Sequence, residues 1–145
     1  MKLVIQRVKS AQVKVSGQLV NKIGAGSLIF VGVAAHDQLT SAVQLAAKVC
    51  KLRMFSDPAG KMNLNLFQVG GQILSISQFT LLADLRRGNR PSFQDAGDPE
   101  HAQSLYHEFN QQLISHGADV KTGIFGADML ISLENDGPVT FEMEA

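Results

Sequence analysis

The sequence predicts an α+β fold, in which two helices cover a mostly antiparallel curved sheet or open barrel. Segments with strand character outnumber helical segments, turn residues recur between the strands, and only two segments place apolar residues at helical spacing. The sequence shows no internal repeat, low-complexity tract or long linker. We therefore expect residues 1–145 to form one domain.

The first part of the chain has the pattern of three strands. The apolar residues at the two ends of 3–15 share odd positions, as in a long strand with one buried face. Ser16-Gly17 is typical of a hairpin turn, and 19–23 fits the return strand. Another turn at 24–26 precedes the nearly continuous apolar run 28–33, which predicts a central buried strand.

Two segments indicate helices. Ser41–Gln44 matches a capping box, and helical spacing of apolar residues follows, which predicts a helix over 41–53. Asp98 suits the N-cap of a second helix, with Pro99 at its first position and Gly117 after its end. The buried face of that helix should consist of Ala102, Leu105, Tyr106, Phe109 and Leu113.

The composition argues against several classes of protein. No apolar run reaches about 18 residues, so we expect no membrane span. Charged residues at Lys2, Arg7 and Lys9 interrupt any signal-peptide pattern, which leads us to expect a cytoplasmic location. Cys50 is the only cysteine, so it has no internal disulfide partner, and within the helical pattern it fits a core residue better than a nucleophile.

The charge is distributed unevenly although the formal net charge is zero. Residues 1–90 contain 12 cations and 3 acids, a net +9, whereas 91–145 contain one cation and ten acids, a net −9. This asymmetry either marks a basic face for a polyanion or disappears where the two halves interleave in space. The sequence leaves both interpretations open.

The sequence predicts neither a metal site nor a cofactor. The four histidines lack ligand spacing such as HExxH, and they are His36, His101, His107 and His116. There is no Walker motif, and Gly24–Gly26 lacks the third glycine of a dinucleotide fingerprint. Spacing leaves a Ser-His-Asp arrangement open, but there is no GxSxG elbow.

Polar residues interrupt the strand-like segment 72–82. Ser75, Ser77, Gln78 and Thr80 alternate with apolar neighbours, so either face of a strand would carry polar groups beside apolar ones. Buried polar groups cost free energy unless they are hydrogen-bonded. They therefore either satisfy one another across the sheet or face a functional site.

A second feature is the segment 135–140, with the letters NDGPVT, between the apolar strand segments 129–133 and 139–143. Pro138 cannot donate to a strand ladder, and Gly137 tolerates unusual backbone angles. A cis bond would turn the chain sharply and aim two carbonyls outward, whereas a trans bond would give an ordinary turn.

Arg7 is the third feature, because it shares parity with the apolar residues of its strand. An unbroken strand would point it inward, where an arginine needs acceptors. It either clamps a carbonyl near a site or turns to solvent at a bulge.

SQFTL at 77–81 and NDGPVT at 135–140 occur in this order on a chain of 145 residues. Together with shorter motifs, they make the chain resemble the D-aminoacyl-tRNA deacylase family from the first residue nearly to the last. The shorter motifs are 6–8, 52–55, 60–63, 88–93 and 125–129.

The resemblance implies a hydrolase that cuts the ester joining a D-amino acid or glycine to tRNA and rejects L-aminoacyl-tRNA. It also implies a tight homodimer with active sites at the subunit interface, where SQFTL frames one pocket and the partner's NDGPVT reaches into it. Gly137-Pro138 would be cis, and its carbonyls would leave no room for an L side chain. Asn135 and Arg7 are expected to belong to the same chirality-selecting group.

The resemblance places the chemistry at Ser77, Gln78, Phe79 and Thr80. A backbone N–H of Phe79–Thr80 would stabilise the oxyanion, Gln78 would position the adenosine and Ser77 would brace the pocket. Thr80 could attack as a hydroxyl, although the sequence shows no base beside it. The favoured alternative uses water, assisted by the ribose 2′-hydroxyl of the substrate.

The loop with Arg86, Arg87 and Arg90 suits contact with the acceptor-stem phosphates of tRNA, or else is a solvated loop. Two other functions compete with the hydrolase. A non-catalytic tRNA- or DNA-binding module would use the same basic face, and an amino-acid-binding regulatory domain would ignore tRNA. A pure nucleic-acid binder would not need a polar strand paired with the Gly-Pro break.

Overall fold

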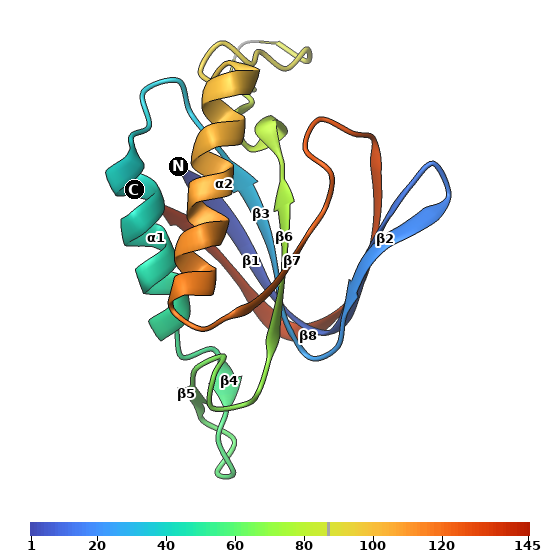
Figure 1. Ribbon diagram of the computed structural model, residues 1–145, viewed down its shortest axis with the longest axis vertical. Helices are drawn as coiled ribbons and strands as arrows, with labels where there is room; N and C mark the ends of the chain where they lie inside the picture. The colour runs from blue at the N-terminus through green and yellow to red at the C-terminus, as the bar shows by residue number, and fades with distance from the viewer. Residues whose placement is uncertain (87) are drawn as a thin grey trace.

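The structure, a computed structural model, describes residues 1–86 and 88–145. A six-stranded sheet carries two helices against one face, and a separate two-stranded hairpin projects from one end (Figure 1). The elements in chain order are β1 (Lys2–Val15), β2 (Gln18–Ile23), β3 (Gly26–Gly32), α1 (Leu39–Lys51), β4 (Phe55–Ser56), β5 (Met62–Leu64), β6 (Gln72–Ser77), the 3-10 helix η1 (Phe79–Leu82), α2 (Pro99–Ser115), β7 (Asp119–Thr122) and β8 (Met129–Glu144).

The sheet is mixed, with β1 at its centre. β1 pairs antiparallel with β2, β3 and β8, whereas β6 pairs parallel with both β3 and β7. Parallel neighbours need long crossover connections, and α1 and α2 lie within these connections. The expected α+β class with two covering helices is confirmed.

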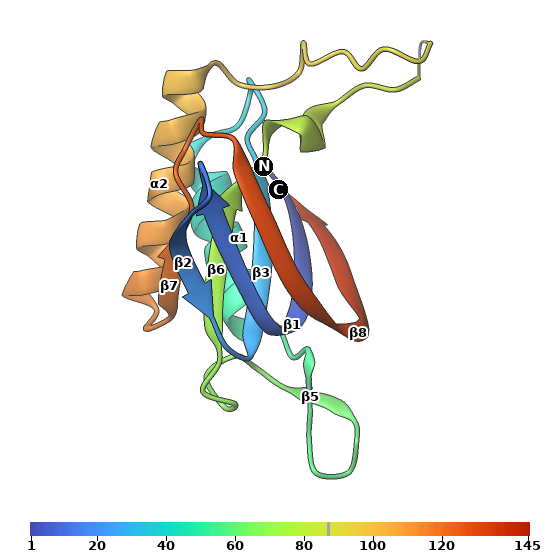
Figure 2. The same cartoon turned by 90° about the vertical axis from the view of Figure 1, so that its right-hand side faces the viewer.

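The sheet curves until its two end strands nearly meet (Figure 2). The side chain of Asn21 in β2 donates from Nδ2 to the carbonyl oxygen of Thr122 in β7, at 2.6 Å. This contact joins opposite ends of the strand order β2-β1-β3-β6-β7. The open barrel expected from the sequence is therefore almost closed.

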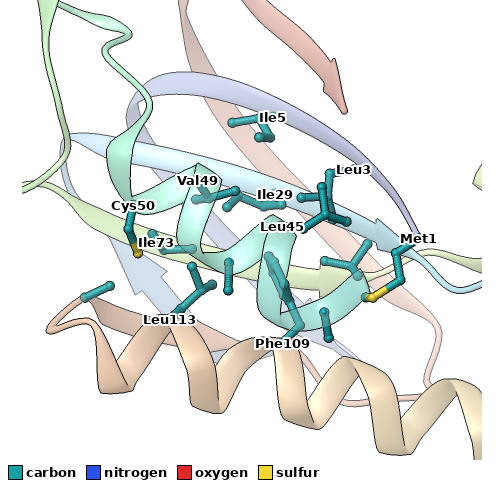
Figure 3. Close-up of a cluster of buried hydrophobic side chains, with 14 of the residues drawn as sticks. Met1, Leu3, Ile5, Ile29, Leu45, Val49, Cys50, Ile73, Phe109 and Leu113 are labelled. Atoms are coloured by element: carbon teal, nitrogen blue, oxygen red, sulfur yellow. The ribbon is translucent and has the colours of Figure 1, made fainter. Parts of the chain in front are cut away.

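The larger core lies between the helices and the sheet, where Phe109 and Leu113 of α2 pack with α1 and with β3 and β6 (Figure 3). Cys50 is buried in this core, as expected, and burial raises the pKa of its thiol. A second core fills the inside of the curved sheet with Val8, Ala11, Val13, Ile23, Leu28, Leu74 and Ile76.

The expectation of one buried face along β1 is wrong. Leu3 and Ile5 pack in the larger core, whereas Val13 packs in the second. The pairing of β1 with β8 shifts register between Gln6 and Ser10. Because a bulge changes which face a side chain occupies, the odd-numbered residues face the larger core before the bulge and the second core after it.

The capping box predicted at Ser41–Gln44 is also wrong. The helix begins at Leu39 after Gln38, which is extended, and no side chain caps it. The chain is held before this start by Asp37, whose carboxylate accepts from the N–H of Ala34 and pairs with the terminal amine of Met1. The helix ends at Lys51 instead of residue 53, because Leu52 is extended.

The second helix follows the expectation. The Asp98 carboxylate accepts from the N–H of His101 at 3.0 Å, and Pro99 occupies the first position. The predicted apolar stripe is buried. After Ser115, Gly117 adopts a φ of 91°, which favours glycine and allows the chain to leave the helix.

Candidate active site

The strand predicted to continue to residue 82 ends at Ser77, and the chain then turns into η1. Ser77 pairs with Val31 of β3, and the N–H of Gln78 donates to the carbonyl oxygen of Val31 at 2.8 Å. Side chains therefore alternate between the two faces of the sheet only up to Ser77. The segment from Gln78 to Thr80 leaves the ladder and presents its groups at the end of the sheet.

The polar groups of this segment do not satisfy one another across the sheet. Gln78 donates from Nε2 to the hydroxyl of Thr80 within the segment. In the described part of the chain, the fully buried Ser75 hydroxyl has no hydrogen-bond partner. The Ser75 carbonyl instead accepts from the Tyr106 hydroxyl of α2 at 2.8 Å, and burial raises the pKa of Tyr106. Tyr106 therefore stays a neutral donor that ties β6 to α2.

A pocket of about 470 Å³ opens beside Ser77, Gln78 and Phe79. Its volume lies in the range typical of small-molecule sites. The opposite wall is the loop 125–129 leading into β8, and the first turn of α2 closes one side with Pro99 and Ala102. Thr80 does not line this pocket, so among the four proposed catalytic residues it lies furthest from the enclosed space.

Phe79 offers an aromatic face at the rim. Its side chain is 56% exposed and meets Phe93 edge to face, with ring centroids 5.1 Å apart. An exposed aromatic ring supported by a second ring is suited to stacking on a nucleobase.

A larger cavity, of about 660 Å³, lies between α2 and β7. Helix side chains such as Gln103 and His107 line it, and neither Ser77 nor Gln78 reaches it. We place the site in the smaller pocket, because only that pocket joins the polar segment after β6 to an apolar interior.

The segment 136–139 bulges out of the β1–β8 ladder. Gln6 pairs with Thr140 and Val8 with Asn135, so these four residues lie opposite Arg7 alone. The Gly137–Pro138 bond is cis. The sequence predicted two separate strand segments here, whereas the structure has one strand, β8, that runs on both sides of the bulge.

Arg7 holds the bulge from inside. Its side chain is largely buried, its Nη1 donates to the Met54 carbonyl at 2.7 Å, and its Nε donates to the Asp136 carbonyl at 3.1 Å. Arg7 also pairs with the Asp136 carboxylate at 2.9 Å. Asn135 donates from Nδ2 to the carbonyls of Arg7 and Val139. Of the two interpretations of Arg7, the structure shows the one with carbonyl acceptors.

Within one chain, the bulge and the pocket lie far apart. Ser77 pairs with Val31 of β3, and Val31 pairs with Leu3 of β1. The bulge lies opposite Arg7, which is four residues further along β1 than Leu3. That offset is about 13 Å along the strands, and three strand spacings of about 4.8 Å separate β6 from β8. In Figure 2 the bend of β8 and η1 lie at opposite ends of the sheet.

The basic loop differs in part from the expectation. Arg86 forms a two-pronged contact with the Asp84 carboxylate, with donor–acceptor distances of 2.8 and 2.9 Å, and this pairing holds the pKa of Asp84 at about 2. Arg90 is exposed, and Arg87 lies outside the described residues. Asp84 therefore occupies Nε and Nη2 of Arg86 and offsets its charge, while Nη1 keeps its donors for another acceptor.

Over residues 1–86 and 88–145, no group of three or more His, Cys, Asp or Glu side chains is arranged to hold a metal ion. In the same residues, no helix is long and apolar enough to cross a membrane.

The model of the D-Tyr-tRNA(Tyr) deacylase family matches residues 4–144. The chain belongs to this family. The D-aminoacyl-tRNA deacylase of Lactobacillus delbrueckii subsp. bulgaricus is 52% identical over 144 residues, 99% of each chain. That of Alteromonas mediterranea is 52% identical over 137 residues, 94% of each chain. These matches confirm the resemblance inferred from the motifs.

Two solved structures share the fold of this chain. One described as the c-Myc DNA unwinding element binding protein has a TM-score of 0.94 at 36% identity, covering 100% of this chain and 99% of its own. Another, described as a probable eukaryotic D-amino acid tRNA deacylase, has a TM-score of 0.85 over 99% and 98% of the two chains. At 15% identity, the second likeness supports the fold alone.

Sequence reasoning gave no role to two parts of the pocket wall. The loop 125–129 carried the resemblance as a motif, but nothing in its spacing placed it opposite Ser77. Ala102 belongs to the apolar stripe of α2, which looked like core alone. The small size of Ala102, at the start of that stripe, was the only sequence signal for a pocket there. A larger side chain at this position would fill the pocket.

Proposed function

We propose that this chain is a D-aminoacyl-tRNA deacylase, a carboxylic ester hydrolase that releases a free D-amino acid and tRNA. The observation that carries the proposal is the pocket framed by Ser77, Gln78 and Phe79 in a chain that is 52% identical to curated deacylases. One domain comprising residues 1–145 carries the activity. The cytoplasmic location expected from the sequence stays a prediction.

The pocket has groups suited to the 3′ end of an aminoacyl-tRNA. The exposed ring of Phe79 can stack on the terminal adenine, and the amide of Gln78 can position the adenosine. Backbone N–H groups of Phe79 and Thr80 begin a 3-10 helix, where the first donors have no partner inside the helix. One of these donors would stabilise the charge that develops on the ester carbonyl.

Water is the nucleophile we favour. It attacks the carbonyl carbon, the bond from that carbon to the ribose 3′-oxygen breaks, and the leaving oxygen takes a proton. The Thr80 hydroxyl accepts from the Gln78 amide, and an amide is no base that could activate it. The neighbouring 2′-hydroxyl of the substrate would assist the proton transfer.

Two measurements separate these routes. Thr80→Val should retain near-full single-turnover rate on D-Tyr-tRNA if water attacks, whereas loss of the rate would favour a covalent Thr80 route. A substrate that ends in 2′-deoxyadenosine should react much more slowly with the unchanged protein. Undiminished hydrolysis of the deoxy substrate would rule out assistance by the 2′-hydroxyl.

We further propose that the pocket is completed by the bulge of a second subunit. The distance between the bulge and Ser77 within one chain supports this arrangement, because one chain alone cannot bring both motifs to one ester. A symmetric homodimer would form two such sites.

Subunit mixing tests this arrangement. Gln78→Ala damages the pocket, and Gly137→Ala damages the bulge, so each homodimer should be nearly inactive. After unfolding and refolding as a mixture, half of the dimers combine both chains and carry one intact site. About a quarter of the sites should then be active. If both motifs acted within the same chain, mixing would restore nothing.

Gly137→Ala is a suitable variant because the chain has space for it. The nearest heavy atom to an added Cβ is Oδ1 of Asn135, at 3.5 Å, an ordinary contact. The fold should therefore persist, while hydrolysis of D-Tyr-tRNA falls by about 100-fold or more because the methyl displaces the ester. Size-exclusion chromatography with light scattering checks that the variant stays dimeric.

Selectivity for the D form gives the sharpest test of the function. The proposed bulge excludes an L side chain by steric clash and leaves glycine free to enter. D-Tyr-tRNA and Gly-tRNA should be hydrolysed, and L-Tyr-tRNA should persist. Equal clearance of the D and L forms would contradict the proposal, and binding without release would favour the tRNA-binding module.

We propose that the loop around Arg86, Arg87 and Arg90 contacts acceptor-stem phosphates. Arg86 and Arg90 are both exposed, and Arg86 keeps donors on Nη1 beside its contact with Asp84. Replacing Arg86 and Arg87 with Ala should weaken tRNA binding and reduce its salt dependence. An unchanged salt dependence would identify this segment as an ordinary surface loop.

A further inference from the structure

A second basic surface lies at the other end of the molecule. It consists of Lys48 and Lys51 at the end of α1, Arg53, and Lys61 at the start of β5. All four side chains are exposed. From residue 38 to residue 83 the chain contains only these four cations and a single acid, Asp57. This part of the chain therefore has a net charge of +3.

These cations have no acidic partner in the described part of the chain, where no carboxylate lies within 4.0 Å of them. The Asp57 carboxylate accepts from the backbone N–H groups of Ala59 and Lys61, both at 2.9 Å, and so stabilises the turn between β4 and β5. Arg53 donates from Nη1 to Oδ1 of Asn63 at 3.0 Å. This neutral acceptor orients the guanidinium without cancelling its charge.

The basic surface lies beside the bulge of β8. The β4–β5 hairpin projects at the end of the molecule where β8 bends (Figures 1 and 2). Arg53 directly precedes Met54, whose carbonyl accepts from Arg7, and Arg7 holds Asp136. Phe55 and Ser56 of β4 also line one small cavity together with Arg7 and Asp136.

Helix stability alone does not explain the surface. Lys48 and Lys51 occupy the last turn of α1, where cations interact favourably with the helix dipole. Arg53 and Lys61 lie beyond the helix and gain nothing from it. A projecting arm with positive charge and no acidic partner fits a polyanion.

We infer that these four side chains bind the phosphate backbone of the tRNA whose 3′ end occupies the partner subunit's pocket. The inference rests on the proposed function, in which the bulge of one subunit completes the other subunit's site. The hairpin would then stand beside the entrance to that site. Because the whole chain has no net charge, binding to a polyanion depends on local clusters of this kind.

The test compares two substrates that differ in phosphate content. D-Tyr-tRNA carries the phosphate backbone, whereas adenosine esterified with D-tyrosine at its 3′-hydroxyl carries none. For the variant R53A/K61A, kcat/KM for D-Tyr-tRNA should fall on the order of tenfold, mainly through KM. Its plot of log(kcat/KM) against log salt should be shallower by about one unit per lost phosphate contact. Hydrolysis of the adenosine ester should not change.

A matched variant and a second pair of residues control for general effects. K14A/K22A removes two cations from the β1–β2 hairpin, which also have no carboxylate within 4.0 Å in the described residues, and should leave both substrates unaffected. K48A/K51A should repeat the selective loss on tRNA. If R53A/K61A failed to fold, this second variant would decide the matter.

Three results would overturn the inference. They are unchanged kinetics and salt dependence on D-Tyr-tRNA, an equal loss on both substrates, or an equal loss in K14A/K22A. If the unaltered protein hydrolysed neither substrate, the proposed function would fail separately. Filter binding of tRNA would then test whether the basic surface binds tRNA. Weaker and less salt-dependent binding by R53A/K61A would support this role, and unchanged binding would reject it.

Discussion

At the scale of single residues, Arg7 shows how one buried cation joins distant parts of the chain. It contacts the Met54 carbonyl before β4, and it contacts the backbone carbonyl and Oδ2 of Asp136. Lys9 approaches Oδ1 of the same carboxylate at 3.4 Å. Asp136 keeps part of its side chain in solvent, which lowers the desolvation cost of the pair. The bulge therefore has a defined position although it leaves the strand ladder.

Arg7→Ala should destabilise the protein by about 2–4 kcal/mol, because it leaves the buried Met54 carbonyl without its donor and the Asp136 carboxylate with Lys9 as its remaining cation. Urea unfolding followed by circular dichroism measures the change in the free energy of unfolding. Arg53→Ala is the control, since an exposed arginine should change stability by about 0.5 kcal/mol or less. Equal effects of the two substitutions would show that Arg7 is not a structural clamp.

Cys50 should be unreactive in the folded protein. Burial raises the pKa of its thiol, so less thiolate is present at neutral pH than in the unfolded chain. The buried, neutral thiol of Cys50 contributes its full stabilisation below the pKa of a thiol in the unfolded chain, about 8.5. This stabilisation declines as the pH rises through the higher pKa of the folded protein. Ellman's reagent should label the protein in urea but only very slowly in buffer at pH 7, and fast labelling of the native protein would contradict this burial.

At the scale of elements, the two helices begin in different ways. α2 begins with a side-chain cap at Asp98 and a proline, both local signals that the sequence displays. α1 begins without a side-chain cap, at a point set by the contacts of Asp37 with Ala34 and Met1. A capping motif inside a helix is therefore no proof of the helix start.

Asp98→Ala should lower the free energy of unfolding by about 1 kcal/mol, because the N–H of His101 loses its acceptor. Ser41→Ala should change it by about 0.5 kcal/mol or less, since Ser41 lies in the first turn of α1 and not at its N-cap. Thermal unfolding of the two variants gives the comparison. A larger loss for Ser41→Ala would restore the capping box.

At the scale of the whole molecule, stability depends on the layer between the helices and the sheet. Phe109 is fully buried there, and it contributes a large side chain to the contact among α2, α1 and the central strands (Figure 3). The curved sheet has a smaller core on its other side. Because β3 is covered on both faces of the sheet, it reads as a nearly continuous apolar run.

Phe109→Ala should destabilise the protein by about 3–5 kcal/mol, because it leaves a cavity in the larger core. Leu19→Ala is the comparison, since that side chain is 55% exposed and should contribute little. Urea denaturation at constant pH provides both values. A loss below about 1 kcal/mol for Phe109→Ala would mean that this layer is loosely packed.

Local sequence signals determined the fold class, the apolar stripe and cap of α2, the burial of Cys50 and the motifs that identified the family. The stripe, the cap and the burial of Cys50 each depend on neighbouring residues of one helix, where spacing alone specifies the backbone or the buried face. The fold class and the family follow from the order of such local signals along the chain.

Only the tertiary structure decided where β6 ends, that 136–139 bulge opposite Arg7, that Arg86 pairs with Asp84 and that the loop 125–129 faces Ser77. Strand register, bulges and the packing of α2 on β6 depend on partners that are often more than 30 residues away, which no local period encodes. The Arg86 pair spans two residues, but its formation depends on how the loop folds back, with Asp84 and Ser92 bridged.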